Sequence, residues 1–445
     1  MMRSLYSGVS GLKVHQTRMD VLGNNISNVN TVGFKSSTVN FSELFYQTTQ
    51  VASGPNRATG NGGQNAKQIG LGASLSAINV NIINEGGTQT TNNPFDLKIN
   101  GSSFFVVQNS GTNYFTKAGN FTTDEAGNLV TPSGAYVMGF TSARNEATGD
   151  FELQTDQLRP LSIYGSQYSY TPPAATTQTC FTGNINEEDD SFSTGDGTKT
   201  VMMYAYDNKG YRYGVQVTLK PTGTRGEYEA TAGKVFLGNK ESANVTAAFT
   251  PATFTLNYKE SDGTWIGINN TAGTDTVTLT LTDATVTDTP FAPITVDFSQ
   301  TTSFGSESTM ESTPGDKQGE GAGKAVGNMD AVGIQPDGRI IATYDNGDIA
   351  VIGQLRVAEF INPAGLEKVG DNMFAATMNS GEFDGMGLDI YATGGKFSTS
   401  TLEMSNVDLA SEFTDMIVTQ RGFQANSRVI TTSDTMIEEL LSLKR

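Results

Sequence analysis

The chain has 445 residues, of which 36% are hydrophobic and 17% are charged, and this length predicts two to four domains rather than one core. Its formal net charge of −18 would repel phosphate backbones and anionic lipid, so we expect no binding of nucleic acid and no membrane insertion. A single cysteine, Cys180, excludes an intramolecular disulfide and a cysteine zinc cluster.

The first thirty residues carry apolar side chains at helical spacing. Successive members are separated by threes, fours or sums of these, so they share one face of an amphipathic helix. Gly8, Gly11 and Gly23 interrupt this helix at a cost of about 1 kcal/mol each relative to alanine. The apolar stripe on which we expect helix packing contains Leu5, Val9, Leu12, Leu22 and Ile26.

Residues 31–70 are expected to form an extended connection, in which the Asn- and Gly-rich stretch 57–68 is a loop. Strand signals dominate the next part of the chain. Residues 71–145 and 326–402 are predicted to form the two halves of a discontinuous middle β domain.

Two turn sequences within these halves predict β-hairpins. One is Asn100-Gly101, which lies between two β-rich runs, and the other surrounds Gly347 in the run DNGD. Between the halves, residues 146–325 form Thr-rich runs separated by Gly, Asp and Asn turns. This composition predicts an inserted outer domain of antiparallel strands with a barrel-like form.

The last forty residues repeat the amphipathic helical pattern more strongly. Their apolar residues share a heptad frame that is interrupted by Gln420, Ser427 and Asp434. Helices of this length would extend roughly 35 to 55 Å, longer than most helices of a compact domain, so each needs a partner. The C-terminal stripe contains Leu409, Phe413, Met416, Phe423, Ile430, Ile437 and Leu441.

The sequence thus predicts a mainly β protein with α-helical termini. Residues 1–30 and 403–445 are expected to pair as a coiled-coil inner domain. The chain would then run outward through the middle β domain, form the inserted outer domain and return. We therefore expect an elongated molecule with its two ends together.

No constellation of residues favours catalysis, a cofactor or a metal ion, so we expect a protein that is not an enzyme. A Ser-His or Cys-His pair would have to use His15, the sole histidine, which lies off the apolar stripe. The DNGD run around Asp345 lacks the twelve-residue spacing and terminal glutamate of an EF-hand. Cys180 lies among strand formers, where a small buried side chain is its usual role.

The segment LGNNISNVNTVGFK at residues 22–35 resembles the signature shared by bacterial flagellar rod and hook proteins. FSELFYQT at 41–48 and the last forty residues also resemble that family, as do two stretches of the middle domain. The resemblance covers about half of the chain and occurs in the same order. The motif residues are Asn24, Asn25, Ile26, Ser27, Asn28, Gly33 and Phe34.

The resemblance implies a structural subunit of the bacterial flagellum. Because hook-type members carry a large inserted domain, the insert of about 180 residues favours the hook type over a distal rod protein with an unusual insertion. Hook-type members are extracellular, are exported through the type III apparatus without a cleaved signal peptide, and polymerise into a curved, flexible tube that works as a universal joint and transmits torque. The implied partners are further copies of the chain, a rod protein, the hook cap and hook-filament junction proteins.

Two alternatives remain open from the sequence. A secreted carbohydrate-binding or adhesive β protein would use the Thr-rich insert and the lone Trp265 as its binding surface. Some hook proteins have a cross-linking cysteine, so covalent joining of subunits through Cys180 is a minor hypothesis. Denaturing gels of assembled hooks would decide the second question.

Overall fold

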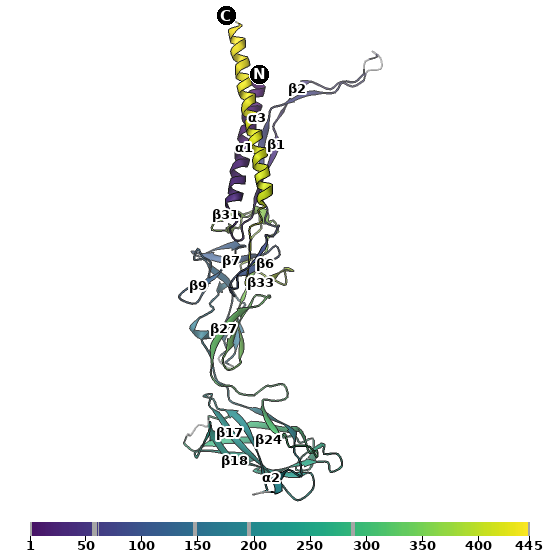
Figure 1. Cartoon of the computed structure of the whole chain (residues 1–445), viewed down its shortest axis with the longest axis vertical. Helices are drawn as coiled ribbons and strands as arrows, with labels where there is room; N and C mark the ends of the chain where they lie inside the picture. Colours follow the sequence, from purple (N-terminus) through teal and green to yellow (C-terminus); the bar gives the residue numbers. More distant parts are fainter. Residues whose placement is uncertain are drawn as a thin grey trace.

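The computed structural model describes residues 2–55, 60, 62–145, 149–193, 197–285 and 290–443. Over these residues the chain is mainly β with one long helix at each end, which confirms the predicted fold class at this level. Figure 1 shows an elongated molecule in which both termini lie toward one tip and the middle of the sequence lies at the other. The chain therefore runs outward through β structure and returns.

The two long helices lie side by side at one tip of the molecule (Figure 1). α1 (Met2–Ser27) is continuous through all three of its glycines, so these residues do not break it. α3 (Leu409–Ser442) begins after the N-cap Asp408, whose carboxylate accepts a hydrogen bond of 3.0 Å from the Ala410 N–H. With 34 residues against 26, α3 extends beyond the end of α1.

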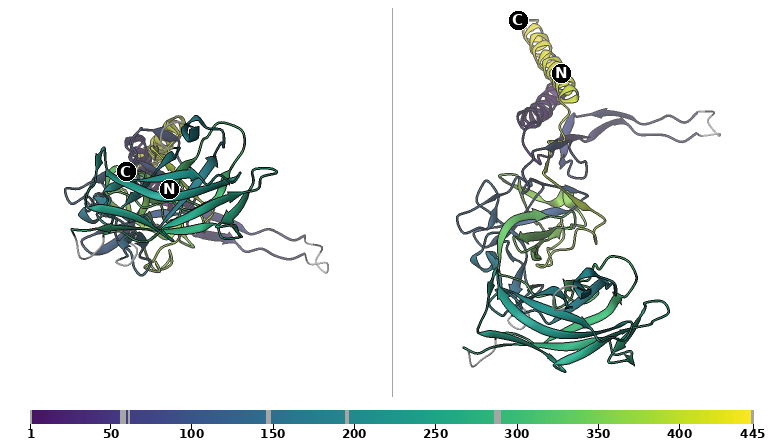
Figure 2. Two further views of the ribbon diagram at one scale, coloured as in Figure 1. Left: turned by 90° about the horizontal axis from the view of Figure 1, so that it is seen from below. Right: turned by 60° about the horizontal axis from the view of Figure 1, so that its bottom comes forward.

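A two-stranded ribbon runs along α1 and then turns away from the body. β1 (Ser37–Glu43) pairs with β4 (Ala73–Val80), and the Ala73 N–H donates to Ser10 Oγ of α1 at 3.4 Å. β2 (Tyr46–Gln50) and β3 (Lys67–Gly70) continue the ribbon as a projecting arm (Figure 2).

This pairing corrects the predicted boundary at residue 71, because β4 belongs with the connection to α1 rather than with the middle domain. Residues 57–59 and 61 of the predicted loop lie outside the described residues.

The middle domain combines strands from both halves of the chain around one sheet, in the order β14-β27-β28-β29-β11-β7-β8-β32-β31. Its apolar core includes Phe105, Val137, Ile340 and Leu355. The short 3₁₀ helices η1 (Ser166–Tyr168) and η2 (Pro363–Gly365) lie in its connections. Its strands are β5 (Thr88–Thr90), β6 (Leu97–Asn100), β7 (Phe104–Asn109), β8 (Thr112–Thr116), β9 (Thr122–Thr123), β10 (Leu129–Val130), β11 (Tyr136–Arg144), β12 (Phe151–Leu153), β13 (Arg159–Pro160), β14 (Tyr170–Thr171), β27 (Gly327–Ile334), β28 (Arg339–Tyr344), β29 (Ile349–Leu355), β30 (Val357–Ala358), β31 (Glu367–Gly370), β32 (Met373–Ala375), β33 (Lys396–Thr399) and β34 (Thr401–Glu403).

One predicted hairpin of the middle domain is confirmed and the other is wrong. β28 and β29 pair across the turn that contains Gly347, whose φ is +87°. By contrast, β6 and β7 flank Asn100-Gly101 but do not pair with each other. β6 pairs with β33, a strand from the C-terminal half, and β7 pairs with β8 and β11. Long-range pairing has replaced the local turn that the sequence favours.

The predicted start of the insert at residue 146 also needs correction. β12, β13 and β14 all pair with strands of the middle domain, so the first half of that domain extends to Thr171. Residues 146–148 lie outside the described residues. The chain leaves the middle domain after an isolated bridge between Ala174 and Lys324.

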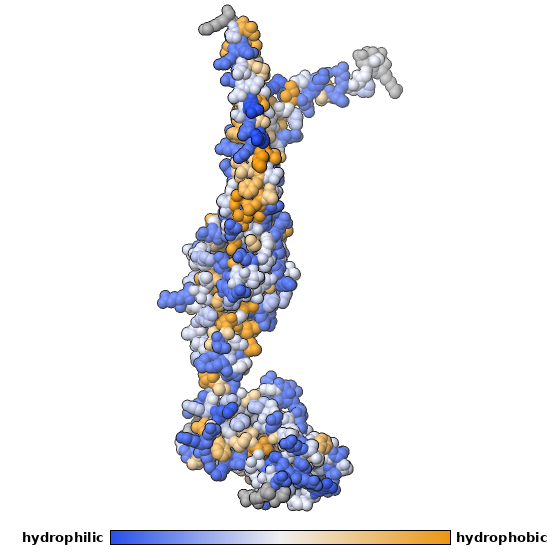
Figure 3. Space-filling view, viewed as in Figure 1, coloured by the Kyte–Doolittle hydropathy of each residue, from blue (hydrophilic) through white to orange (hydrophobic). Residues whose placement is uncertain are grey.

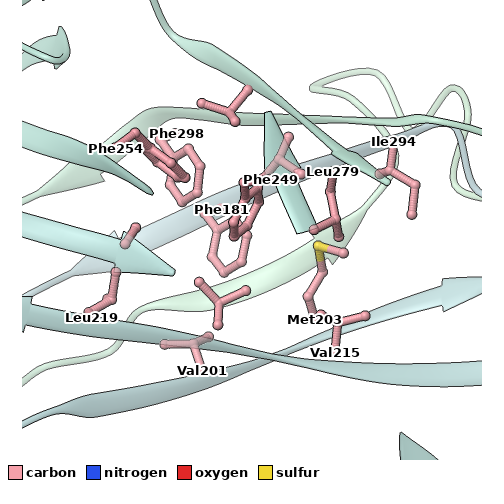
Figure 4. Packing of buried hydrophobic residues seen from close by; sticks show 14 of the residues in the cluster. Phe181, Val201, Met203, Val215, Leu219, Phe249, Phe254, Leu279, Ile294 and Phe298 are labelled. Carbon is pink, nitrogen blue, oxygen red and sulfur yellow. The ribbon is translucent and has the colours of Figure 1, made fainter. Parts of the chain in front are cut away.

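The outer domain consists of two sheets that share one apolar core, which Figure 4 shows from close by. The sheets have the strand orders β20-β24-β25-β15-β26 and β16-β17-β18-β21-β22-β23, with β19 paired to β18. The rings of Phe181 and Phe298 stack in the core with centroids 4.8 Å apart. The elements are β15 (Gln178–Asn184), α2 (Asp190–Ser193), β16 (Lys199–Tyr206), β17 (Arg212–Pro221), β18 (Glu227–Leu237), β19 (Lys240–Glu241), β20 (Val245–Thr250), β21 (Thr253–Tyr258), β22 (Trp265–Ile268), β23 (Thr271–Ala272), β24 (Thr276–Asp283), β25 (Ile294–Thr302) and β26 (Glu311–Pro314).

Among the described residues, the strands of the outer domain pair antiparallel as predicted except at one place, and the predicted barrel-like form is not confirmed. β15 and β25 pair in parallel, which the long excursion of the chain between them allows. Within the described residues, no ladder joins the two sheets into a closed barrel. Cys180 is buried on β15, as expected for a small apolar side chain, and burial raises the pKa of its thiol.

Candidate assembly surface on the terminal helices

Glycine lets α1 and α3 approach each other closely. A Cβ atom at Gly8 would come within 3.1 Å of Ile430 Cγ1, and one at Gly11 would come within 2.7 Å of the Asn426 side chain. Any larger residue at Gly11 would have to displace Asn426. Gly8 and Gly11, two of the three glycines that weaken the isolated helix, thus allow its close approach to α3.

Polar pairs also join the two helices. Arg18 Nη2 lies 2.9 Å from Asp415 Oδ2, and both side chains are partly exposed. Asn25 Nδ2 donates to Glu412 Oε1 at 3.1 Å, and Asn25 is 1% exposed. Burial raises the pKa of Glu412, although the hydrogen bond from Asn25 acts in the opposite direction. The contact between the helices thus depends on geometry and hydrogen bonds as much as on apolar burial.

The face of α1 that meets α3 is adjacent to the predicted stripe. Its members also recur by threes, fours and their sums, and Ser4, Gly8, Gly11 and Asn25 each lie one residue before a member of that stripe. A search for apolar residues misses this face because most of its side chains are small or polar. The spacing of small residues at Ser4, Gly8 and Gly11 was the available signal. The residues of this face with a contact to α3 are Ser4, Gly8, Gly11, His15, Arg18 and Asn25.

Most of the predicted stripe residues are not fully buried within one chain. Of the stripe residues on α1, only Leu22 is buried, and Val9 is exposed. On α3, Phe413 is 50% exposed, although it stands in the predicted heptad frame. The partly buried stripe residues are Leu5, Leu12, Ile26, Met416, Ile430 and Ile437, and the other exposed ones are Leu409, Phe423 and Leu441.

A second set of exposed apolar residues on α3 was not predicted. Ile417 and Val418 are 59% and 57% exposed, and they lie near the base of the helix. Figure 3 shows hydrophobic residues on the surface of the two terminal helices and where these helices join the middle domain. Exposed apolar residues that gather in this way are typical of interaction surfaces. The other members of this second set are Val429, Met436, Leu440 and Leu443.

The asparagine-rich motif ends α1 in an ordered turn. Asn28 Nδ2 donates to the Asn24 carbonyl at 2.9 Å, and Ser27 Oγ donates to the Gly23 carbonyl at 2.8 Å. These side-chain bonds add to the backbone bonds of the last helical turn, where the Asn24 carbonyl also accepts from the Asn28 N–H at 3.2 Å. The short polar side chains of the motif thus fix the place where the chain leaves the helix.

The end of the motif connects the helices to the middle domain. Gly33 has a φ of +68°, and a Cβ atom there would lie 2.7 Å from the Ala118 backbone nitrogen, so only glycine fits. Its N–H donates to the Glu403 carbonyl at 2.8 Å. Phe34 is buried, and the Lys368 Nζ lies 4.7 Å from the centroid of its ring.

Little in the described residues suggests a chemical site. No group of three or more His, Cys, Asp or Glu side chains in these ranges is placed to hold a metal ion. His15 lies against Gly422 and the edge of Phe41, and burial followed by the Arg18 charge lowers its pKa. None of the described helices combines the length and the apolar character needed to span a bilayer.

Three family models match separate parts of the chain. The model described as Flagella basal body rod protein matches residues 5–35. The model described as Flagellar hook protein FlgE/F/G D1 domain matches residues 98–163. The model described as Flagellar basal body rod FlgEFG protein C-terminal matches residues 398–443.

Two relatives match the chain from end to end. The Flagellar hook protein FlgE of Treponema pallidum (strain Nichols) is 35% identical over 491 residues, and that of Borreliella burgdorferi is 34% identical over 461 residues. In both cases the match covers 100% of this chain and 100% of the relative. Among solved structures, the crystal structure of Helicobacter pylori flagellar hook protein FlgE2 matches with a TM-score of 0.47 and 15% identity, covering 71% of this chain and 100% of that one.

Proposed function

Since this chain belongs to the flagellar hook protein FlgE family, we propose that its terminal helices form the core of a hook polymer through the uncovered apolar residues of α3. The chain is a structural subunit of the bacterial flagellar hook. Full-length matches to hook proteins do not favour the rod-type or carbohydrate-binding alternatives.

The observation that carries the proposal is the contrast between the two kinds of surface on α3. The side toward α1 is already occupied, and it uses glycine, serine, asparagine and one ion pair. The flanking sides carry large apolar residues that the described part of the chain leaves about half exposed, such as Phe413 and Ile417. Covering a half-exposed side chain of this size is worth about 1 kcal/mol, so several such residues together favour the association of copies.

We further propose that the partners of the subunit are other copies of the chain in a curved tube, a rod protein, the hook cap and hook-filament junction proteins. Export would take place through the type III apparatus, without a cleaved signal peptide. The paired helices would form a coiled-coil inner layer, and the middle and outer domains would form successive outer layers that bend while the core transmits torque. The proposed subunit has no enzymatic role and needs no cofactor.

The test replaces Phe413 by aspartate and follows polymerisation of the purified subunit by electron microscopy and sedimentation. Thr414→Asp is the matched control, because Thr414 is exposed on the same turn and bonds only to the Ala410 carbonyl. Phe413→Asp should raise the subunit concentration needed for polymerisation by about tenfold or more. Thr414→Asp should polymerise at the same concentration as the native chain. Unaltered tubes from Phe413→Asp would refute the role of this stripe. Met416→Asp, a partly buried position, should also impair assembly.

A further inference from the structure

A buried ion pair joins the two ends of the chain at the base of the helices. Lys35 is the last residue of the family segment 22–35, beyond the end of α1, and Glu403 ends β34, six residues before α3. Lys35 Nζ lies 2.8 Å from Glu403 Oε1, and the two side chains are 1% and 0% exposed. The pair thus connects positions that are 368 residues apart in the sequence.

A third segment, between β4 and β5, completes the surroundings of this pair. The Asn84 carbonyl accepts from Lys35 Nζ at 2.7 Å, and the Gly86 N–H donates to Glu403 Oε1 at 2.9 Å. A Cβ atom at Gly86 would lie 1.8 Å from the Met404 carbonyl oxygen, so the segment and the strand are in direct backbone contact. The pair is enclosed on all of these sides and shielded from water.

Neither member of the pair has a substitute partner of opposite charge in hydrogen-bond contact. Glu403 Oε2 has no hydrogen-bond partner within the described residues, and Lys35 Nζ bonds otherwise only to a carbonyl. The other buried lysines nearby, Lys98 and Lys117, donate to other acceptors. A buried charge that loses its partner is strongly destabilised, because the desolvation of both charges has already occurred.

We propose that the Lys35–Glu403 pair is a lock that makes the docking of the two chain ends onto the middle domain a single event. If the C-terminal strand leaves, Lys35 remains as an unpaired buried cation, and if the N-terminal segment leaves, Glu403 remains as an unpaired buried anion. Each end therefore holds its place only while the other is present. The consequence for assembly, that both helices become available to a neighbouring subunit together, rests on the proposed function.

Hydrogen exchange in the monomeric full-length chain tests the lock, with one reporter amide on each end. The Ser37 N–H bonds to Asn25 Oδ1, within the N-terminal end, and the Met404 N–H bonds to the Gly87 carbonyl, within the body. The variants are Lys35→Met, Glu403→Gln and the double variant. Each single variant should accelerate exchange at both reporters by about tenfold or more, and the double variant should exchange more slowly than either.

Two controls separate the lock from general destabilisation. The Leu129 N–H, which bonds to the Leu161 carbonyl in the middle domain, should keep its native exchange rate in all variants. Lys199→Met, which removes an ion pair with Asp189 in the outer domain, should change neither reporter. If Lys35→Met does not fold, Glu403→Gln alone decides, because it keeps an acceptor for the Gly86 N–H.

The lock is overturned if Glu403→Gln accelerates exchange only at Met404 and leaves Ser37 as in the native chain. It is also overturned if the double variant shows the sum of the single effects. These results do not depend on polymerisation. If Phe413→Asp forms normal tubes while exchange at the two reporters is coupled, the proposed assembly surface is refuted and the lock stands. If Phe413→Asp fails to polymerise while exchange is uncoupled, the lock is refuted and the assembly surface stands.

Discussion

Lys117 offers a sharp test of how the buried charges at the base of the helices affect stability. Its side chain is almost fully buried, its Nζ donates to the Gly101 carbonyl at 2.6 Å, and it lies 5.1 Å from the centroid of the Phe104 ring. Burial lowers the pKa of Lys117 from 10.5 to about 8. The charges that act on it are those of Glu403, Lys35, Glu85 and Lys98, and the two carboxylates offset the burial only in part.

The lowered pKa means that the folded chain holds this proton less tightly than the unfolded chain does. The difference between 10.5 and about 8 corresponds to a cost of roughly 3 kcal/mol, which is fully present below pH 8. The cost disappears as pH rises from about 8 to 10.5, so this group makes stability increase over that range. Lys117→Met removes the cost and leaves the Gly101 carbonyl without its donor, which takes back about 1 kcal/mol. The variant should therefore be more stable by about 2 kcal/mol at pH 7.

The assay is urea unfolding of the middle domain between pH 7 and 10.5, read from the exchange of protected amides such as that of Leu129. Lys117→Met should raise the unfolding free energy at pH 7, and its advantage should shrink as pH rises. Lys220→Met, at an exposed position on β17, is the control and should shift neither quantity. A Lys117→Met chain that is no more stable than the native chain at pH 7, or whose advantage does not depend on pH, would refute the reasoning.

Three further predictions concern the helix pair and the outer domain. Gly11→Ala should weaken the helix pair by about 1–3 kcal/mol, because its Cβ would lie 2.7 Å from the Asn426 side chain of α3. Gly23→Ala, whose Cβ would meet nothing within 4 Å, should stabilise α1 by up to about 1 kcal/mol. Thermal unfolding followed by circular dichroism measures both effects. Because the pKa of His15 is lowered below 6.5, its protonation favours the unfolded chain, so acidification below pH 6.5 should reduce the helical signal, and His15→Gln should abolish this dependence. The Asn184 side chain donates to the Phe304 carbonyl and accepts from the Phe304 N–H. Asn184→Ala should therefore destabilise the outer domain by about 2 kcal/mol. Urea unfolding followed by tryptophan fluorescence measures this, and an unchanged midpoint would contradict it.

The sequence was most informative where a pattern is local and long. The two terminal helices follow from apolar residues repeated over many turns, and the hairpin at Gly347 follows from its turn chemistry. The motif that ends α1 could also be recognised, because its asparagines act on carbonyl groups within a few residues. In each case the physical cause lies close to its effect along the chain.

The predictions that failed concern features whose physical cause lies far away along the chain. The sequence Asn100-Gly101 is typical of a hairpin turn. In the structure, however, the Gly101 N–H donates to the Glu85 carboxylate and the Gly101 carbonyl accepts from Lys117. The chain therefore turns a corner here, and β6 pairs with the distant strand β33. The contact face of α1 was missed because glycine and serine carry no apolar signal. The partnership of Lys35 with Glu403 has no local trace at all. Which distant segments meet is decided by tertiary packing, and no window of the sequence contains it.

The polar character of the α1–α3 seam has a consequence for how one chain can serve a polymer. A seam made of large apolar residues would satisfy each helix within its own chain and leave little energy for neighbours. Here small residues such as Gly8 and Gly11 bring the backbones together, and large apolar residues such as Phe413 and Ile417 stand beside the seam, 50% and 59% exposed. The same pairing fixes the direction in which these residues point, and the buried ion pair at Lys35 ties that direction to the middle domain. A subunit built in this way presents exposed apolar surface to its neighbours in a fixed orientation. A helical tube with one repeated contact requires both the surface and the fixed orientation.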